Sequence, residues 1–264
     1  MERFNIIPPS AVLAPYVKHY WLLESDDVVS SQRVFPSGNI ELLFHRGSLM
    51  KRKEGLIPAT SLSGHTLSFA DLIPTGTVKM IAVVFHPYGV KAFFEFPAHE
   101  LSDLIVSADD LNIRSLKELE DRILYTDDDN SCIRLIESFL IEQLKPFKEY
   151  NYKRMIEAVR TIDQCNEELS VSSLAERVYL GKKQFQRIFS EYIGATPKEF
   201  MRIIRFHKAL YTLQNHPAIN FTTLAHACGY YDQAHMINEF KVFSGYTPGQ
   251  YTAICAPYSD YFST

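Results

Sequence analysis

Residues 170–200 read SVSSLAERVYLGKKQFQRIFSEYIGATPKEF, and residues 220–251 read NFTTLAHACGYYDQAHMINEFKVFSGYTPGQY. The two segments are copies of one pattern. Leu174 matches Leu224 at an offset of 50, and the Gly-x-Thr-Pro sequence late in each copy matches at an offset of 51. One residue is therefore added in the middle of the second copy, where a turn can absorb it. An internal repeat of this kind decides the architecture of this part of the chain.

Each copy predicts two short helices joined by a tight turn. Apolar residues recur at helical spacing in both halves of each copy, and glycine interrupts them at Gly181 and Gly229. Ser170 and Asn220 are typical N-cap residues, and the Thr-Pro pair of each copy begins a capping box. Two short helices around such a turn form a helix-turn-helix unit, whose second helix can lie in the major groove of DNA.

The tandem pattern resembles the C-terminal DNA-binding domain of the AraC/XylS transcription regulators over residues 151–256. The Gly-x-Thr-Pro repeat and the Gly-aromatic turn before Asp232 carry this resemblance. The family places its two helix-turn-helix units on either side of one long helix, which the resemblance locates at residues 197–213. The first turn departs from the family pattern, because Tyr179-Leu180-Gly181 stands where a Gly-aromatic pair is common.

The outward side chains of the second helix in each copy are the candidate DNA contacts. In the first copy they are long hydrogen-bond donors, which suit base edges and phosphates: Lys182, Lys183, Gln184, Gln186 and Arg187. The second copy is less basic and offers Gln233, Ala234, His235, Asn238 and Lys241. The resemblance implies a structural role for Arg205 in the long helix, and it leaves Arg202 and Lys198 as candidates for phosphate contacts.

The N-terminal part predicts a β-rich domain. Short strands separated by Gly and Pro turns are expected at residues 16–24, 32–35, 39–45, 62–69 and 77–86. We expect an irregular lead-in at 5–15, a basic loop at 47–55, short helices near 90–94, 98–104 and 116–124, and an amphipathic helix at 130–145. The expected fold class is α+β. A small β-barrel or sandwich with trailing helices occupies residues 1–147, and an all-α domain of two helix-turn-helix units joined by a long helix occupies residues 148–264.

Three N-terminal segments, PPSAVLAPYVKHYW, FPSGNIELLF and VVFHPYGVKAFFEFPAHELSD, resemble the N-terminal domain of one subgroup of AraC-type regulators. The effector domain of the family is often a cupin-like β-barrel, so the resemblance implies a sensory position for this part. An apolar pocket with a few polar groups would suit a small-molecule effector. The expected effector-binding residues are Tyr20, Trp21, Phe35, Glu41 and His86. The alternative interpretation is that these residues belong to the core of the domain itself.

The charge distribution agrees in sign with DNA binding by the C-terminal part. The whole chain carries a net charge of −4. Residues 1–150 contain 15 Lys and Arg against 21 Asp and Glu, a net of −6, and residues 151–264 contain 12 against 10, a net of +2. No apolar run approaches the length of a membrane span, and the N-terminus lacks a secretory signal pattern. The four cysteines are widely spaced, as in reduced cytoplasmic proteins: Cys132, Cys165, Cys228 and Cys255.

The sequence contains none of the motifs that would predict an enzyme. The nine histidines form no H-x-H, H-x-x-H or H-E-x-x-H pattern, and no nucleophile elbow, phosphate loop or dinucleotide fingerprint occurs. We therefore expect no catalytic residues, no metal and no cofactor. The expected partners are double-stranded DNA, a small-molecule effector and a second copy in a homodimer, with no membrane. The alternative function is a sensor or adaptor whose helical domain binds a protein partner.

Overall fold

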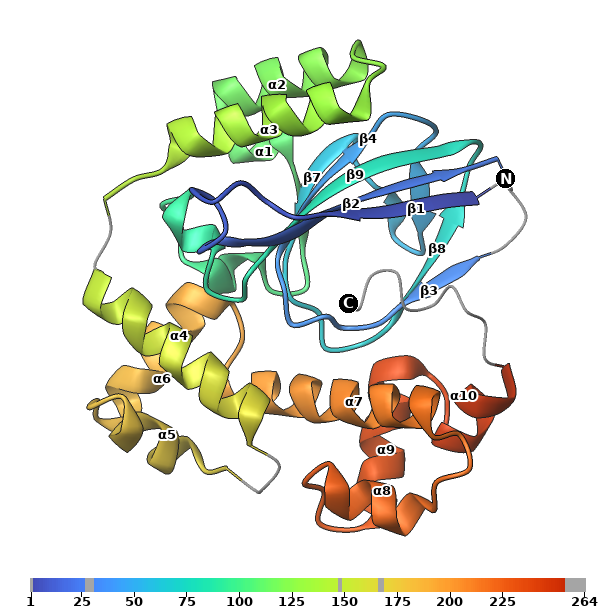
Figure 1. Cartoon of the computed structure of the whole chain (residues 1–264), viewed down its shortest axis with the longest axis vertical. Coiled ribbons are helices and arrows are strands. Elements are labelled where there is room, and N and C mark those ends of the chain that lie inside the picture. Colours follow the sequence, from blue (N-terminus) through green and yellow to red (C-terminus); the bar gives the residue numbers. More distant parts are fainter. Residues whose placement is uncertain (1, 27–30, 147–148, 166–168, 255–264) are drawn as a thin grey trace.

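The computed structural model describes residues 2–26, 31–146, 149–165 and 169–254, with strands in the N-terminal part and helices in the C-terminal part (Figure 1). The fold class is α+β, as expected. One antiparallel sheet has the order β1 (Glu2–Ile7), β2 (Val17–Ser25), β9 (Val78–Phe85), β4 (Glu41–His45), β7 (Thr60–Ser63) and β10 (Ile105–Ser107). A smaller sheet has the order β3 (Gln32–Val34), β8 (Ala70–Pro74), β5 (Met50–Arg52) and β6 (Gly55–Leu56).

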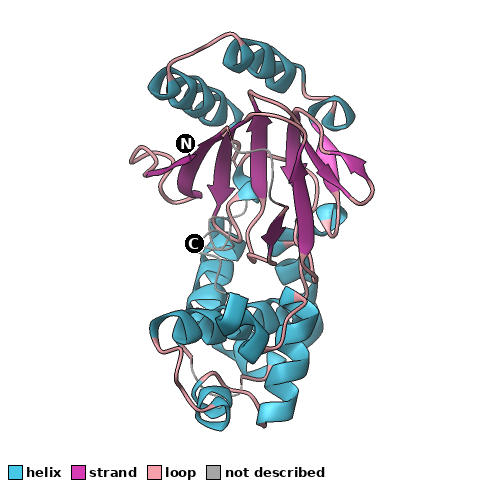
Figure 2. Ribbon diagram, turned by 90° about the vertical axis from the view of Figure 1, so that its right-hand side faces the viewer, coloured by secondary structure: helices cyan, strands magenta, loops and turns pink. Residues whose placement is uncertain are grey.

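The larger sheet is the middle layer of the N-terminal part (Figure 2). Side chains alternate across it, because successive residues of a strand point to opposite faces. On one face Tyr20, Phe44 and Phe85 pack against helices α1 (Ala108–Leu111), α2 (Arg114–Leu124) and α3 (Asp129–Gln143). On the other face Trp21 and Met80 join the core shared with the smaller sheet. The N-terminal part is therefore a sandwich with helices on its outer face. Of the two architectures expected from the sequence, the sandwich is confirmed and the closed barrel is wrong.

The C-terminal part consists of helices in the order that the repeat predicts. After α4 (Glu149–Gln164), the first unit comprises α5 (Val171–Arg177) and α6 (Lys182–Ile193), and the second comprises α8 (Phe221–Ala227) and α9 (Gln233–Ser244). Helix α7 (Pro197–Asn215) joins the two units, and α10 (Pro248–Ile254) follows the second. Thr196 and Glu199 form the predicted capping box at the start of α7.

Several strands depend on long-range pairing and were not predicted. The expected irregular lead-in begins with β1, which pairs along its length with β2, and the expected basic loop contains the short hairpin β5–β6. Strands β8 and β10 were also missed. The helices expected near 90–94 and 98–104 are single 3-10 turns, Val90–Ala92 and Ala98–Leu101. Strands of this kind form because a partner strand is available, and local sequence carries little signal for them.

Candidate nucleic-acid interface

The first helix-turn-helix unit positions α6 through one tight turn. Val178 is the C-cap residue after α5, and Tyr179 follows in the left-handed region with φ of +57°. The backbone amide of Leu180 then donates to the carbonyl oxygen of Ala175 at 2.9 Å, which closes the turn. Helix α6 buries an apolar face that includes Phe185, and the two phenylalanine rings of this helix are 5.5 Å apart. The opposite face is consequently turned to solvent.

All the residues predicted to contact DNA in the first unit lie on that exposed face: Lys182, Lys183, Gln184, Gln186 and Arg187. Arg187 Nη1 lies 3.9 Å from a carboxylate oxygen of Glu191, and the Arg187 side chain is 71% exposed. An exposed pair at this distance contributes little energy, so the guanidinium is free to bind another partner. The arrangement can present three cations and two amides to a groove of DNA.

The second unit repeats the geometry with different chemistry. Gly229 takes the left-handed position of the turn with φ of +75°, and the Asp232 side chain caps α9 by accepting from the His235 amide at 2.7 Å. Of the residues predicted to contact DNA, Ala234, Asn238 and Lys241 are exposed, whereas Gln233 and His235 are half-buried. The Gln233 amide oxygen accepts a hydrogen bond from the Thr222 hydroxyl at 2.8 Å, which ties α9 to α8.

Helix α9 is attached to α7 by a buried carboxylate that sequence reasoning missed. The Glu239 side chain is 4% exposed and accepts a hydrogen bond from Arg202 Nε at 2.6 Å and from Arg205 Nη2 at 3.4 Å. The Arg205 guanidinium also lies over the Tyr230 ring at 5.1 Å. Arg205 therefore has the structural pairing that the resemblance implied. Arg202 makes the shorter bond to Glu239, so this arginine also has a structural contact. The signal in the sequence was a charged residue, Glu239, on the face of the helix that carries the apolar core residues.

A cleft between the two units exposes further cations. Its volume is about 540 Å³, and Lys198 and Arg202 of α7 line it together with His235 and Asn238 of α9. Lys208 also lines the cleft, but its Nζ donates to the carbonyl oxygens at the end of α4, including that of Cys165 at 2.6 Å. The cleft therefore places Lys198 and the outer edge of Arg202 beside the reading face of α9, where a DNA backbone can approach.

The five residues predicted to bind an effector do not converge on one pocket. Tyr20 and Trp21 are neighbours on β2 and lie in the two different cores of the sandwich. Phe35 packs into the core of the second helix-turn-helix unit. Glu41 lines a cavity of about 80 Å³ between the two sheets, and burial raises the pKa of its carboxyl to about 7. That cavity can hold only a few water molecules.

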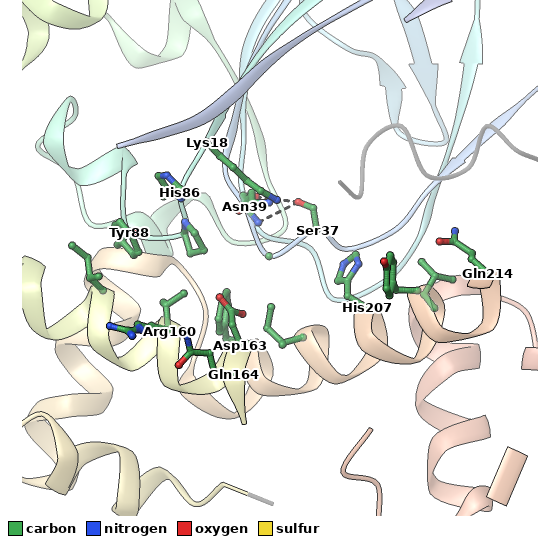
Figure 3. Close-up of a pocket in the computed structure, with 18 residues that line it drawn as sticks. Lys18, Ser37, Asn39, His86, Tyr88, Arg160, Asp163, Gln164, His207 and Gln214 are labelled. Carbon is green, nitrogen blue, oxygen red and sulfur yellow. Dashed lines mark hydrogen bonds between the residues drawn. The ribbon is translucent and has the colours of Figure 1, made fainter. Parts of the chain in front are cut away.

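A larger cavity lies between the N-terminal and C-terminal parts, and His86 is the only one of those five residues that lines it (Figure 3). Its volume is about 770 Å³, within the range of small-molecule sites. The N-terminal part contributes Lys18, Asn39 and Tyr88 among others. Apolar side chains of α4 and α7 form much of the opposite wall, and Arg160, Asp163, His207 and Gln214 add polar groups. We call this space the interdomain cavity.

The described residues contain no cluster of three or more His, Cys, Asp or Glu side chains arranged to hold a metal ion. Among the helices within the described ranges, none combines the length and apolar character required to cross a membrane. Cys132, Cys165 and Cys228 form no disulfide with one another in the described part of the chain, and Cys255 lies outside the described residues.

Comparison with known proteins matches both parts of the chain separately. Residues 5–107 match a domain of unknown function (DUF6597), and residues 174–254 match a helix-turn-helix domain. The HTH-type transcriptional activator RhaS of Pectobacterium carotovorum is 35% identical over 80 residues, which are 30% of this chain and 28% of that protein. An uncharacterized HTH-type transcriptional regulator of Haemophilus influenzae is 27% identical over 116 residues, 44% of this chain and 39% of that protein.

These matches span less than half the length of either curated relative. Among solved structures, ToxT from Vibrio cholerae aligns with 96% of this chain and 98% of its own, at 8% identity and a TM-score of 0.47. The assignment of the C-terminal part depends instead on the two repeated units, their exposed second helices, the long connecting helix and the matched helix-turn-helix domain. The C-terminal part is an AraC-type helix-turn-helix domain, and a domain of unknown function precedes it.

Proposed function

We propose that the chain is a sequence-specific transcription regulator that acts in the cytoplasm and binds double-stranded DNA through both helix-turn-helix units. The observation that carries the proposal is the pair of repeated units with exposed second helices, held on one long helix. Helices of this kind enter the major groove and contact base edges with their outward side chains. Residues 1–147 and 148–264 would act as the sensory and DNA-binding domains.

Within this proposal the two half-sites are read unequally. Helix α6 offers Lys182, Lys183 and Arg187, whereas the exposed face of α9 has no cation before Lys241. Charged donors that reach base edges in pairs discriminate between bases more strongly than short neutral side chains. Selection from random DNA should therefore return one informative half-site and one weakly specified half-site. Two equally informative half-sites would contradict this expectation.

A mobility-shift assay with salt titration tests DNA binding directly. The triple variant Lys182→Ala, Lys183→Ala and Arg187→Ala removes three cations from α6. The matched control Lys51→Ala, Arg52→Ala and Lys53→Ala removes three cations from the β5–β6 hairpin. If the cations of α6 contact DNA, the first variant loses most of its affinity and flattens the salt dependence, by roughly one unit of slope per lost phosphate contact. The control should bind as the unmodified protein does.

The alternative proposal is a sensor or adaptor whose helical part binds a protein. If no DNA sequence is enriched from a random library, and the two triple variants behave alike in the shift assay, this alternative replaces DNA binding. The exposed amides and cations of α6 would then be a protein-binding face. A pull-down with the α6 variant and the hairpin control would compare the same charge losses.

We also propose that a small-molecule effector binds in the interdomain cavity and not inside the sandwich. The cavity between the sheets holds about 80 Å³, against about 770 Å³ between the two parts. A ligand in the larger cavity would contact Lys18 and His86 on one side and α4 and α7 on the other. It would therefore distinguish between docked and separated arrangements of the two parts, which is what control by a ligand requires.

A metabolite screen by thermal shift would test the effector proposal, with Ile204→Trp as the variant that fills the cavity and Leu56→Trp as an exposed control. A ligand that raises the melting temperature of the control but not of the filled variant supports the site. A ligand that stabilises both equally binds elsewhere.

A homodimer formed through the N-terminal part stays a prediction, and sedimentation velocity at several protein concentrations would test it.

A further inference from the structure

The N-terminal part contacts both helix-turn-helix units at equivalent positions of the repeat. Gly194 is the C-cap residue of α6 and Gly245 is that of α9, and these two glycines correspond to each other in the repeated sequence. Both have left-handed φ values, +90° and +76°. Residues of the N-terminal part lie against each of them. The N-terminal part therefore contacts the same position of the repeat in each unit.

At the end of α6 the contact is a close backbone approach with a hydrogen bond. Ser102 Oγ donates to the Gly194 carbonyl oxygen at 2.6 Å. A Cβ placed on Gly194 would lie 3.0 Å from the carbonyl oxygen of Ala98 and 3.0 Å from a ring carbon of His65. The His65 ring also meets Phe200 of α7 edge-on, with centroids 6.4 Å apart. The fit leaves little room for α6 to move relative to the sandwich.

At the end of α9 the contact centres on Arg33, with Phe69 beside it. Arg33 Nη1 donates to the Ser244 carbonyl oxygen at 3.3 Å, and the guanidinium lies over the Phe69 ring at 4.1 Å and over the Tyr246 ring at 4.5 Å. Asp71 holds the same guanidinium through two hydrogen bonds of 2.7 and 2.9 Å. A cation is favoured at this place, because the carbonyl end of a helix carries partial negative charge.

The two units need such a connection because they do not share one core. The buried apolar residues of the first unit form one cluster with Phe200, and those of the second form another with Phe206, so each unit packs on its own stretch of α7. Phe35 of the N-terminal part is a member of the second cluster, 5.8 Å from Phe206. The Tyr152 hydroxyl of the first cluster donates to the Pro15 carbonyl oxygen at 2.7 Å.

The predicted reading faces are not covered by these contacts. Lys183 and Arg187 on α6, and Ala234 and Asn238 on α9, are exposed while the N-terminal part is docked. The N-terminal part therefore cannot control DNA binding by covering these side chains. It can act on DNA binding through the direction in which the two helices point relative to each other.

We propose that the N-terminal part is a brace that sets the relative orientation of α6 and α9 by holding the carbonyl ends of both helices. The consequence, which rests on the proposed DNA-binding function, is that the brace determines which spacing between half-sites the protein accepts. The interdomain cavity borders α7 from Phe200 to Gln214, on the helix that joins the two held units. A ligand there would act on the brace itself.

The orientation can be measured without DNA. Spin labels at Glu176→Cys and His226→Cys occupy equivalent exposed positions on α5 and α8, with Cys165 and Cys255 replaced by serine. Pulsed electron resonance then gives the distance distribution between the units in the full chain. The variant Arg33→Ala with Ser102→Ala removes both hydrogen bonds to the helix ends. The matched control Arg114→Ala with Ser138→Ala removes the same residue types from exposed sites on α2 and α3.

We expect the brace variant to broaden the distance distribution by about twofold or to shift its maximum, and the control to match the unmodified protein. A distribution that is unchanged in the brace variant overturns the proposal. If the brace variant does not fold, Arg33→Lys with Ser102→Ala keeps a charge beside Asp71 but lacks the planar stack and the fork that reaches Ser244. The same outcomes then apply to that variant.

A DNA-binding experiment tests whether the brace determines the accepted spacing between half-sites. One inserted base pair between the half-sites of a selected operator turns one half-site by about 35° relative to the other. The unmodified protein and the control should lose about tenfold or more in affinity on this operator, and the brace variant about threefold or less. Equal losses of affinity in all three proteins would show that the brace does not determine which spacing between half-sites the protein accepts. If no protein binds any selected DNA, the proposed function fails, and the distance measurement still decides the brace.

Discussion

The two helix-turn-helix units have one backbone design and different side-chain chemistry. Helix α6 attaches to its surroundings through apolar residues, with Ile188 buried at the position where α9 has Glu239. On the outward face the relation is reversed, because α6 has Arg187 where α9 has Asn238. The first unit therefore keeps its charge outside, for a partner, and the second uses charge inside, for attachment to α7. The same fold can thus divide positioning and recognition between two copies.

The largest expected effect is on the attachment of the second unit. Glu239→Ala removes a carboxylate that is 4% exposed and leaves Arg202 and Arg205 without it. Because those arginines are partly exposed, we expect a loss of about 3 kcal/mol in the free energy of unfolding, at the low end for a broken buried pair. Urea denaturation measures it. Glu191→Ala, in the first unit, is the control and should cost under about 1 kcal/mol.

The next effect sharpens the comparison of the outward faces. Arg187→Ala should weaken binding to the selected operator by about 2 kcal/mol and binding to random DNA by less, because a bidentate base contact is lost. Asn238→Ala changes the equivalent position of α9 and should cost clearly less on the same operator. Fluorescence anisotropy with both DNA classes provides the numbers. Equal losses on operator and random DNA would make Arg187 a phosphate contact.

A pH titration separates the two contacts of the brace. Burial lowers the pKa of His65 to about 4, so the neutral ring is favoured in the folded protein. The neutral His65 ring contributes fully to the free energy of unfolding above about pH 6.5, and this contribution is lost as the pH falls toward 4. Between pH 7.5 and 5.5, His65 alone should lower the free energy of unfolding by about 1–1.5 kcal/mol.

Arg33, which holds the second unit, stays charged over this range. The variant His65→Gln should therefore lose that part of the pH dependence, whereas Arg33→Lys should keep it. Urea denaturation at several pH values measures both. A titration that His65→Gln leaves unchanged would assign the pH dependence to other groups.

The smallest effect concerns the turns. Tyr179 occupies a left-handed conformation where the second unit has Gly229, and a side chain there costs about 1–2 kcal/mol. Tyr179→Gly relieves this strain and adds backbone entropy to the unfolded chain, so the net stabilisation should be roughly 0.5 kcal/mol. Tyr231→Gly, at an exposed tyrosine without this strain, should destabilise. Destabilisation by Tyr179→Gly would show that the tyrosine makes a contact worth more than its strain.

The C-terminal helices could be predicted from the sequence because their signals are local. Helical periodicity, the N-caps Ser170 and Asn220, and the Thr196 capping box each act within a few residues, and the repeat supplied every signal twice. Exposure of the α6 and α9 faces followed from the same periodicity. Strands β2, β4 and β9 were also predicted, because apolar strands inside a sheet are strongly patterned.

Only the tertiary structure decided which residues meet. The sequence placed five effector candidates together by composition, whereas the sheet separates Tyr20 from Trp21 and docking carries Phe35 into another core. The interdomain cavity and the contacts at Gly194 and Gly245 join residues far apart in the chain. Such contacts depend on how finished elements pack against each other, and no local pattern records that choice. The sequence by itself determined the repeat and its two exposed helices, and packing determined how the N-terminal part holds them.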